Sequence, residues 1–125
     1  YEQVDFETLL TQSDIISVHA PLNEHTEGLI NSKAFEKMKS SCIFLNLGRG
    51  PIVDEQALYN ALVRNQIAAA GLDVLCKEPM SADNPLLKIK DSKRLLITPH
   101  IAWASVEART HLMEIIHGQV KDFFA

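Results

Sequence analysis

The sequence predicts a doubly wound α/β fold built on a parallel sheet. Three observations support this fold class. Short apolar segments alternate with helical segments along the chain, as they do in βα units. The apolar segments are continuous rather than alternating, which is typical of parallel strands covered on both faces. The chain has 125 residues, 46% of them hydrophobic, which is enough for one domain with a modest core.

Two helices and two strands are expected in the first part of the chain. Asp5 is a suitable N-cap for a helix in the segment DFETLL. A strand is predicted from Ile15 to Val18, and Pro21 stops it. Ser32 is a candidate cap for a short helix in SKAFEKM. The apolar segment CIFLNL is the second predicted strand.

Two further helices and two further strands are expected after residue 50. The segment DEQALYNALVRN predicts a helix because Leu58, Ala61 and Leu62 fall on one face. IAAAGLDVL and RLLITP are the third and fourth predicted strands. The polar segment CKEPMSADNPLLKIKDSK joins them, and its length suggests a functional loop. Ser105 is expected to cap a final long helix with an apolar stripe formed by Leu112, Ile116, Val120 and Phe123.

Charge and composition argue against several classes of function. The formal net charge is −4 and no run of Lys and Arg offsets it, so a nucleic-acid-binding surface is not expected. No apolar stretch is long enough to span a membrane. Cys42 and Cys76 fit no metal-binding or redox spacing. We therefore expect two free thiols in a reducing cytoplasm and no metal site.

Chemically active residue types follow each predicted strand. In open parallel sheets, ligands bind beyond the carboxyl ends of the strands. His19 follows the first strand, and Arg49, set between two glycines and followed at once by proline, comes after the second. Asp73 and Glu78 follow the third strand, and His100 follows the fourth. We therefore expect an arginine, two acids and two histidines at one edge of the sheet.

Three of these residues form a set with a shared chemical use. Taken singly, each has a structural alternative: a surface arginine, a solvated glutamate or a hydrogen-bonded histidine. Together, Arg49 can hold a carboxylate through two parallel hydrogen bonds. His100 can donate or accept a proton near neutral pH, and Glu78 would orient its ring. The set suits reduction of a 2-keto acid, in which the arginine places the substrate and the histidine protonates the oxygen as a hydride reaches the carbon.

Four motifs resemble the nucleotide-binding domain of the NAD-dependent D-2-hydroxyacid dehydrogenases. They are SDIISVHAPL with TEGLIN, FLNLGRGPIVDEQAL, AGLDVLCKEP and LLITPHIAWAS, and they cover almost the whole chain in the family's order. The resemblance implies that Arg49 binds the substrate carboxylate, that His100 is the acid/base and that Glu78 is its partner. It also implies that Asp73 contacts the nicotinamide carboxamide. The other residues expected at the cofactor are His19, Ala20, Pro21, Asn46, Leu47, Gly48 and Ala102.

Within this family, PHIAWAS and EPM look most similar to the glycerate dehydrogenase or hydroxypyruvate reductase branch. Members of the phosphoglycerate branch usually carry a smaller residue where Trp103 stands. Formate dehydrogenases typically carry glutamine where Glu78 stands. The resemblance thus implies hydroxypyruvate/glycerate or glyoxylate/glycolate as substrates, and NAD or NADP as the cofactor.

The glycine turn that opens the family's nucleotide-binding domain is not found in this sequence. That turn, G-x-G-x-x-G, cradles the pyrophosphate. We therefore expect residues 1–125 to be the second half of a Rossmann-type dinucleotide-binding domain that lacks its first βαβ half, with the substrate domain absent. Such a piece is expected to be inactive alone and to self-associate, as a homodimer. The alternatives are an NAD-sensing co-repressor with the same fold, or a purely structural fragment.

Overall fold

A four-stranded parallel sheet forms the centre of the computed structural model, which describes residues 2–125. The strands follow one another across the sheet in the order β1-β2-β3-β4, and every neighbouring pair is parallel. The predicted parallel α/β sheet is therefore confirmed, with β1 at one edge and β4 at the other. The strand bounds are β1 (Ile15–Val18), β2 (Ile43–Asn46), β3 (Ala69–Leu72) and β4 (Leu95–Ile97).

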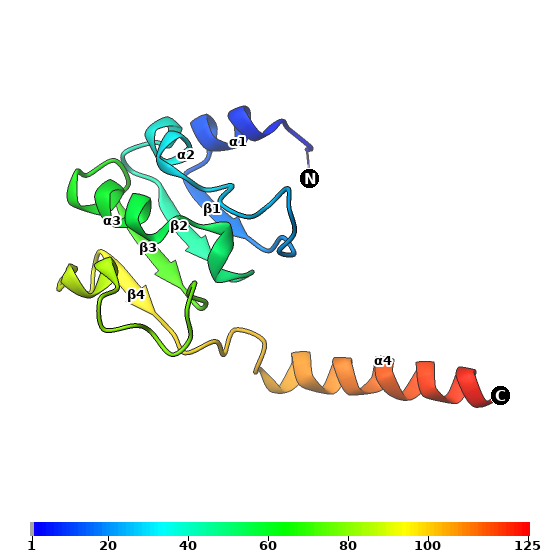
Figure 1. The fold of residues 1–125 in the computed structure, drawn as a ribbon. Coiled ribbons are helices and arrows are strands. Elements are labelled where there is room, and N and C mark those ends of the chain that lie inside the picture. Colours follow the sequence, from blue (N-terminus) through cyan, green and yellow to red (C-terminus); the bar gives the residue numbers. More distant parts are fainter. Residues whose placement is uncertain (1) are drawn as a thin grey trace.

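One layer of helices covers a single face of this sheet (Figure 1). The layer consists of α1 (Phe6–Gln12), α2 (Ser32–Lys37) and α3 (Glu55–Val63). Two short 3-10 helices lie in the connections, η1 (Gly50–Ile52) after β2 and η2 (Pro85–Lys88) after β3. Each connection between neighbouring strands therefore carries a helical element, as the alternating pattern of the sequence predicted.

The capping prediction is confirmed for α1 and wrong for α2. Asp5 caps α1, as expected. The cap of α2 is Asn31 rather than Ser32, which is already the first helical residue. Asn31 has an extended backbone, and its side-chain oxygen accepts hydrogen bonds from the N–H groups of Lys33 (3.0 Å) and Ala34 (3.3 Å). Both Asn and Ser satisfy free N–H groups at a helix start, so residue type alone did not separate the two neighbours.

The face of the sheet under α1, α2 and α3 holds the hydrophobic core. Phe44 of β2 is fully buried and meets Phe35 of α2 edge to face, with ring centroids 5.4 Å apart. Such aromatic pairs add to the free energy gained by burial. We call this side the covered face; its strand residues are Ile16, Val18, Phe44, Asn46, Ala70, Leu72, Leu95 and Ile97.

The opposite side of the sheet is not covered by any helix of residues 2–125, and we call it the open face. Its strand residues alternate with those of the covered face, and Ile15 and Leu96 are 60% and 62% exposed. Residues 2–125 therefore cover the strands on one face only, although the continuous apolar pattern of these strands is typical of coverage on both faces. These residues are Ile15, Ser17, Ile43, Leu45, Ala69, Gly71 and Leu96.

The final helix does not return to the sheet. Figure 1 shows α4 (Val106–Phe124) extending away from the sheet, and none of its residues is buried. Ser105 caps it, as predicted, by accepting a hydrogen bond from the N–H of Ala108 (3.1 Å). The apolar stripe predicted for this helix is exposed. Neither α4 nor any other helix within residues 2–125 has both the length and the apolar character that crossing a membrane requires.

The register of the sheet brings the carboxyl ends of all four strands level. Val18 pairs with Asn46, Asn46 with Leu72, and Leu72 with Ile97. The loops that follow the four strands therefore start side by side in one row. This row, which we call the strand-end row, carries the residues that the sequence singled out.

Candidate active site

A buried amide organises the loop that carries Arg49. Asn46, the last residue of β2, is 1% exposed. Its Nδ2 donates to the carbonyl of Arg49 (3.0 Å), and its Oδ1 accepts from the N–H of Gly48 (3.1 Å). The guanidinium of Arg49 is exposed and donates to the neighbouring carbonyl of Gly48 (3.0 Å). Since guanidinium carries five N–H donors, most of them remain available for a ligand.

The two glycines that flank Arg49 allow neighbouring loops to approach closely. A Cβ atom at Gly50 would lie 2.0 Å from the backbone carbonyl of Leu75 and 2.4 Å from the nitrogen of Cys76. The loop after β3 therefore packs directly on the loop after β2, with no room for a side chain. A Cβ atom at Gly48 would lie 3.0 Å from the carbonyl oxygen of Ala20, in the loop after β1. The glycines serve this close packing rather than a positive φ angle.

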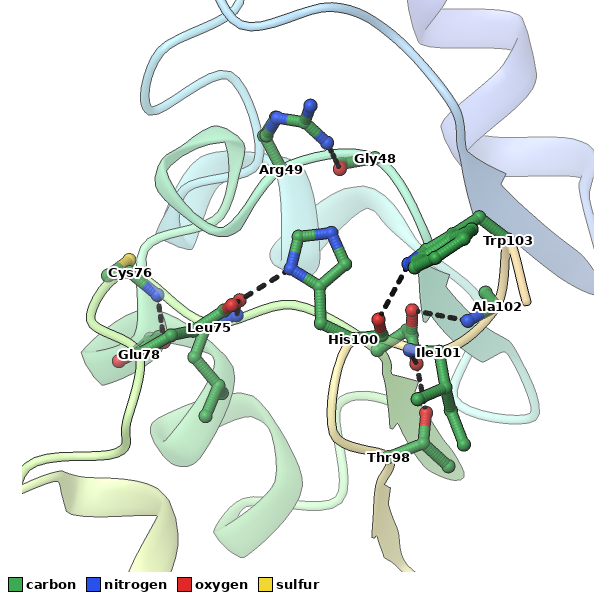
Figure 2. A network of polar contacts seen from close by, with 12 residues as sticks. Gly48, Arg49, Leu75, Cys76, Glu78, Thr98, His100, Ile101, Ala102 and Trp103 are labelled. Atoms are coloured by element: carbon green, nitrogen blue, oxygen red, sulfur yellow. Dashed lines mark hydrogen bonds and ion pairs between the residues drawn. The ribbon is translucent and has the colours of Figure 1, made fainter. Parts of the chain in front are cut away.

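His100 has a left-handed backbone, with φ of 58°. This conformation is uncommon for residues other than glycine, and backbone strain of this kind clusters at functional sites. Its N–H donates to the carbonyl of Thr98 (3.0 Å), and its carbonyl accepts from the indole N–H of Trp103 (3.0 Å). Figure 2 shows the imidazole ring pointing toward the loop that carries Arg49. The backbone contacts thus hold the ring on that side of the strand ends.

Glu78 and His100 are joined, as the sequence predicted. Glu78 Oε2 lies 2.8 Å from His100 Nδ1 (Figure 2). The other carboxylate oxygen accepts from the N–H of Leu75 (2.9 Å). The hydrogen bond from Leu75, followed by that with His100, holds the pKa of Glu78 below its ordinary value. A carboxylate that stays ionised fixes the orientation of the imidazole ring.

Asp73 holds the loop that follows β4. Its Oδ1 accepts from the hydroxyl of Thr98 (2.5 Å) and the N–H of Ile101 (2.9 Å), and its Oδ2 accepts from the N–H of Ala102 (2.8 Å). Burial by itself would raise the pKa of this carboxyl, but these hydrogen bonds outweigh burial and lower the pKa. Asp73 therefore fixes the backbone on either side of His100.

The predicted cofactor residues other than Asp73 and Ala102 lie at the ends of β1 and β2. His19 is exposed, and its Nε2 lies 2.8 Å from the hydroxyl of Ser17, which belongs to the open face. The N–H of Leu47 donates to the carbonyl of Val18 (3.1 Å), which joins the two loops. Asn46 is turned inward, as described above. The remaining members of this group are Ala20, Pro21 and Gly48.

A cavity of about 660 Å³ lies beside the Glu78–His100 pair. Its wall is mostly apolar and includes Met80, Ile97 and Pro99. Arg49 does not line it, so this hollow is separate from the side of the pair that faces the arginine. The two sides of His100 therefore differ: one lines an apolar hollow, and the other is turned toward the loop that carries Arg49 (Figure 2).

Sequence reasoning missed the partners that hold these groups in place. Thr98 binds Asp73 across 25 residues of sequence, and no local pattern marks that contact. The bond from Trp103 to the carbonyl of His100 spans three residues, and a donor at that spacing could have been noticed. Glu78 and His100 are thus in contact and Arg49 follows the end of β2, while the groups that support these residues appear only in three dimensions.

The arrangement supports proton transfer next to a bound anion. Because Nδ1 of His100 faces the carboxylate of Glu78, Nε2 is the nitrogen left to exchange a proton, and it forms no hydrogen bond within residues 2–125. The exposed fork of Arg49 fits a carboxylate or phosphate. Within residues 2–125 no group of His, Cys, Asp and Glu side chains is placed to hold a metal ion.

Comparison with known proteins gives consistent results. The family model described as D-isomer specific 2-hydroxyacid dehydrogenase, NAD binding domain, matches residues 1–102. A hydroxypyruvate reductase of Blautia hydrogenotrophica is 47% identical over 120 residues, which are 96% of this chain and 36% of that protein. A D-3-phosphoglycerate dehydrogenase of Archaeoglobus fulgidus is 51% identical over 113 residues, 90% of this chain and 21% of that protein. The chain thus spans well under half the length of these relatives.

Solved structures show the same relationship. An acyclic imino acid reductase, Bsp5, in complex with NADPH and D-Arg has a TM-score of 0.85 and 37% identity, covering 98% of this chain and 38% of that one. The D-lactate dehydrogenase of Lactobacillus jensenii with NAD+ has a TM-score of 0.78 and 37% identity, covering 90% and 37%. The chain belongs to the D-isomer specific 2-hydroxyacid dehydrogenase family, and the part that matches is the NAD-binding domain of that family.

Proposed function

We propose that the chain is the second half of the dinucleotide-binding domain of an NAD- or NADP-dependent oxidoreductase, and that this enzyme interconverts a small 2-keto acid and a D-2-hydroxy acid. The observation that carries the proposal is the Glu78–His100 pair in the same strand-end row as Arg49. Family membership supports it, as do the relatives solved with NAD+ and with NADPH.

In this proposal, three residues handle the substrate. Arg49 holds the substrate carboxylate with its fork and places the 2-keto group beside His100. When bound, the reduced nicotinamide supplies the hydride to the carbonyl carbon. His100 Nε2 gives its proton to the carbonyl oxygen, so that the keto acid gains one hydride and one proton and becomes the hydroxy acid. Glu78 stabilises the charged imidazole before the transfer and keeps Nε2 aimed at the substrate.

The residues at the ends of β1 and β2 fit a flat nicotinamide ring. Most of them are small or apolar, and Gly48 packs tightly on the backbone of Ala20. Asp73 Oδ2 accepts a single hydrogen bond from within the chain, which leaves capacity to accept one from the carboxamide. Ala20, Pro21, Leu47, Gly48 and Ala102 would line the cofactor, and His19 would lie at its border.

We infer that hydroxypyruvate or glyoxylate is the substrate, because relatives bear the names hydroxypyruvate reductase, glycerate dehydrogenase and glyoxylate/hydroxypyruvate reductase. The test is a turnover assay on the full-length protein that carries this chain, with NADH or NADPH and each acid in turn. D-3-phosphoglycerate, assayed in the oxidative direction with NAD+ or NADP+, is the comparison substrate. We expect turnover of hydroxypyruvate or glyoxylate above that of phosphoglycerate. Binding of NADH without turnover of any acid would instead support the co-repressor alternative.

Arg49→Lys tests the arginine within this proposal. A lysine provides a point charge but not the bidentate fork, so we expect a large rise in KM for the keto acid together with a loss of turnover. The affinity for NADH, measured by fluorescence titration, should be unchanged because Arg49 does not hold the cofactor. Normal kinetics for the keto acid in this variant would remove Arg49 from the substrate site.

We also propose that the isolated chain self-associates as a dimer and binds NAD weakly. The exposed apolar side chains of the open face and the unpaired edge of β1 support association. Light scattering of the chain and of a Leu96→Lys variant tests the first claim, and calorimetric titration with NAD tests the second. A monomer at micromolar concentration would contradict the dimer. The cytoplasmic location stays a prediction, which cell fractionation can test.

A further inference from the structure

The position of Glu78 depends on a loop that runs from Leu75 to Asn84, here called the glutamate loop. Glu78 reaches His100 only if this loop keeps its path. Its carboxylate is 39% exposed, and within residues 2–125 it has one other partner, the N–H of Leu75. The start of the loop rests on Gly50, as described above. What fixes the rest of the loop is a separate carboxylate.

Glu55, the first residue of α3, reaches both ends of the glutamate loop. Its Oε1 accepts from the N–H of Cys76 (2.8 Å), two residues before Glu78. Its Oε2 accepts from the side-chain amide of Asn84 (2.7 Å), six residues after Glu78. The carboxylate of Glu55 thus joins Cys76 and Asn84, which lie 21 and 29 residues after it in the sequence.

The surroundings of Glu55 favour its fixed position. It lies in the first turn of α3, where the helix dipole stabilises a negative charge, while the separate residue Asp54 caps the helix. Asn84 is 8% exposed, and its Oδ1 accepts from the N–H of Leu86 (2.9 Å), so its Nδ2 necessarily faces Glu55. Burial, followed by the charge of Glu55, raises the pKa of the Cys76 thiol to about 11, so Cys76 stays neutral beside it.

We propose that Glu55 is a positioning residue that sets the distance between Glu78 and His100 by clamping both ends of the glutamate loop. In this proposal it contacts neither substrate nor cofactor, because both of its carboxylate oxygens bind the glutamate loop. It also couples the two substrate-handling loops, because α3 follows the Arg49 loop directly while Glu55 holds the loop that carries Glu78. The kinetic consequence of this inference rests on the proposed function. Its structural consequence rests on the hydrogen bonds alone.

An exchange of hydrogen-bonding groups tests the clamp. In Glu55→Gln, the amide at position 55 can accept from Cys76 but then presents its own N–H₂ to the amide of Asn84, and that contact is lost. In the double variant Glu55→Gln/Asn84→Asp, the new amide at position 55 donates to the new carboxylate at position 84. That carboxylate still accepts from the N–H of Leu86. The net charge of the double variant equals that of the wild type.

The kinetic measurement uses the full-length protein that carries this chain. We expect Glu55→Gln to lower kcat by about 10-fold or more, through misplacement of the acid/base pair, with the KM for the nicotinamide cofactor little changed. The double variant should recover most of the lost kcat. Glu36→Gln, an exposed glutamate on α2, is the matched control and should behave as the wild type. Unchanged kcat in Glu55→Gln, or an equal loss in the single and double variants, would overturn the proposal.

A structural readout separates this inference from the proposed function. Carbon-13 NMR of the glutamate carboxyls follows the titration of Glu78 in the same variants, whether or not the protein turns over a keto acid. We expect the pKa of Glu78 to rise toward its ordinary value of 4.5 in Glu55→Gln, because the loop no longer holds it against its donors. The double variant should reverse this rise. An identical titration of Glu78 in wild type and Glu55→Gln would contradict the clamp. Failure of turnover in the wild type would count only against the proposed function.

Discussion

The two faces of the sheet are made of similar residues but have different environments. On the covered face, Ile16 and Phe44 pack under three helices and are 4% and 0% exposed. On the open face, their sequence neighbours Ile15 and Ile43 face outward, and no helix of residues 2–125 lies over them. Apolar composition therefore indicates that a strand residue can pack against another apolar surface. Whether that residue is buried depends on which helices cover its face of the sheet.

The apolar side chains of the open face and of α4 are consistent with a chain that forms part of a larger fold. This chain matches 36% and 38% of the length of two relatives, so those relatives are about three times as long as this chain. In a doubly wound fold, helices cover both faces of the sheet. The strand-end row lies between the two faces, and the hydrogen bonds that hold Asn46, Asp73 and Glu78 form without any cover on the open face.

The largest stability difference is expected between Ile16→Ala and Ile15→Ala. The two isoleucines are adjacent in β1 and point to opposite faces, so each is the control for the other. Ile16→Ala leaves a cavity in the core and should lower the free energy of unfolding by about 2–5 kcal/mol. Ile15→Ala should change it by at most about 0.5 kcal/mol. Urea unfolding of the two variants measures both. Equal losses would mean that the open face is packed as tightly as the covered face.

A pair of glycine substitutions extends the comparison to the site and α4. Gly50→Ala pushes a Cβ atom into the backbone of the glutamate loop. We therefore expect the free energy of unfolding to fall by about 1–3 kcal/mol. Gly118→Ala, in the interior of α4 with nothing within 4 Å of the added atom, should raise helix stability by up to about 1 kcal/mol. Thermal unfolding followed by circular dichroism checks both. A neutral Gly50→Ala would show that the two loops are not in the close contact described here.

The smallest expected effect is the pH dependence that Asp73 adds to stability. Its folded-state pKa lies below the ordinary value of 3.8, so the unfolded chain binds its proton first as the pH falls. The stability from Asp73 is therefore complete above that ordinary value and is lost as the pH falls through the folded-state pKa. In Asp73→Asn, the free energy of unfolding should decrease less steeply as the pH falls through this acidic range. Unfolding curves that show the same pH dependence in both proteins would argue against the role of Asp73 in holding the β4 loop.

Much of the fold and the central site could be predicted from local patterns. Asp5 and Ser105 cap the helices that their sequence context indicated, and the bounds of β1 are those predicted. Arg49 and His100 follow parallel strands, so their meeting at one edge follows from topology. The role of Glu55 could not be predicted, because its two contacts join residues 21 and 29 positions away. Which face of the strands is open could not be predicted, because sequence pattern does not show which elements cover a strand.

The central claim is that His100, oriented by Glu78, transfers the proton in a hydride-transfer reaction at the strand-end row. The most direct test is the steady-state kinetics of His100→Ala in the full-length protein that carries this chain, with hydroxypyruvate and NADH or NADPH. We predict that kcat falls by about 10²- to 10⁴-fold while the dissociation constant of the cofactor stays the same, because the proton is needed only as the carbonyl is reduced. A variant that turns over at a near-normal rate would contradict the account.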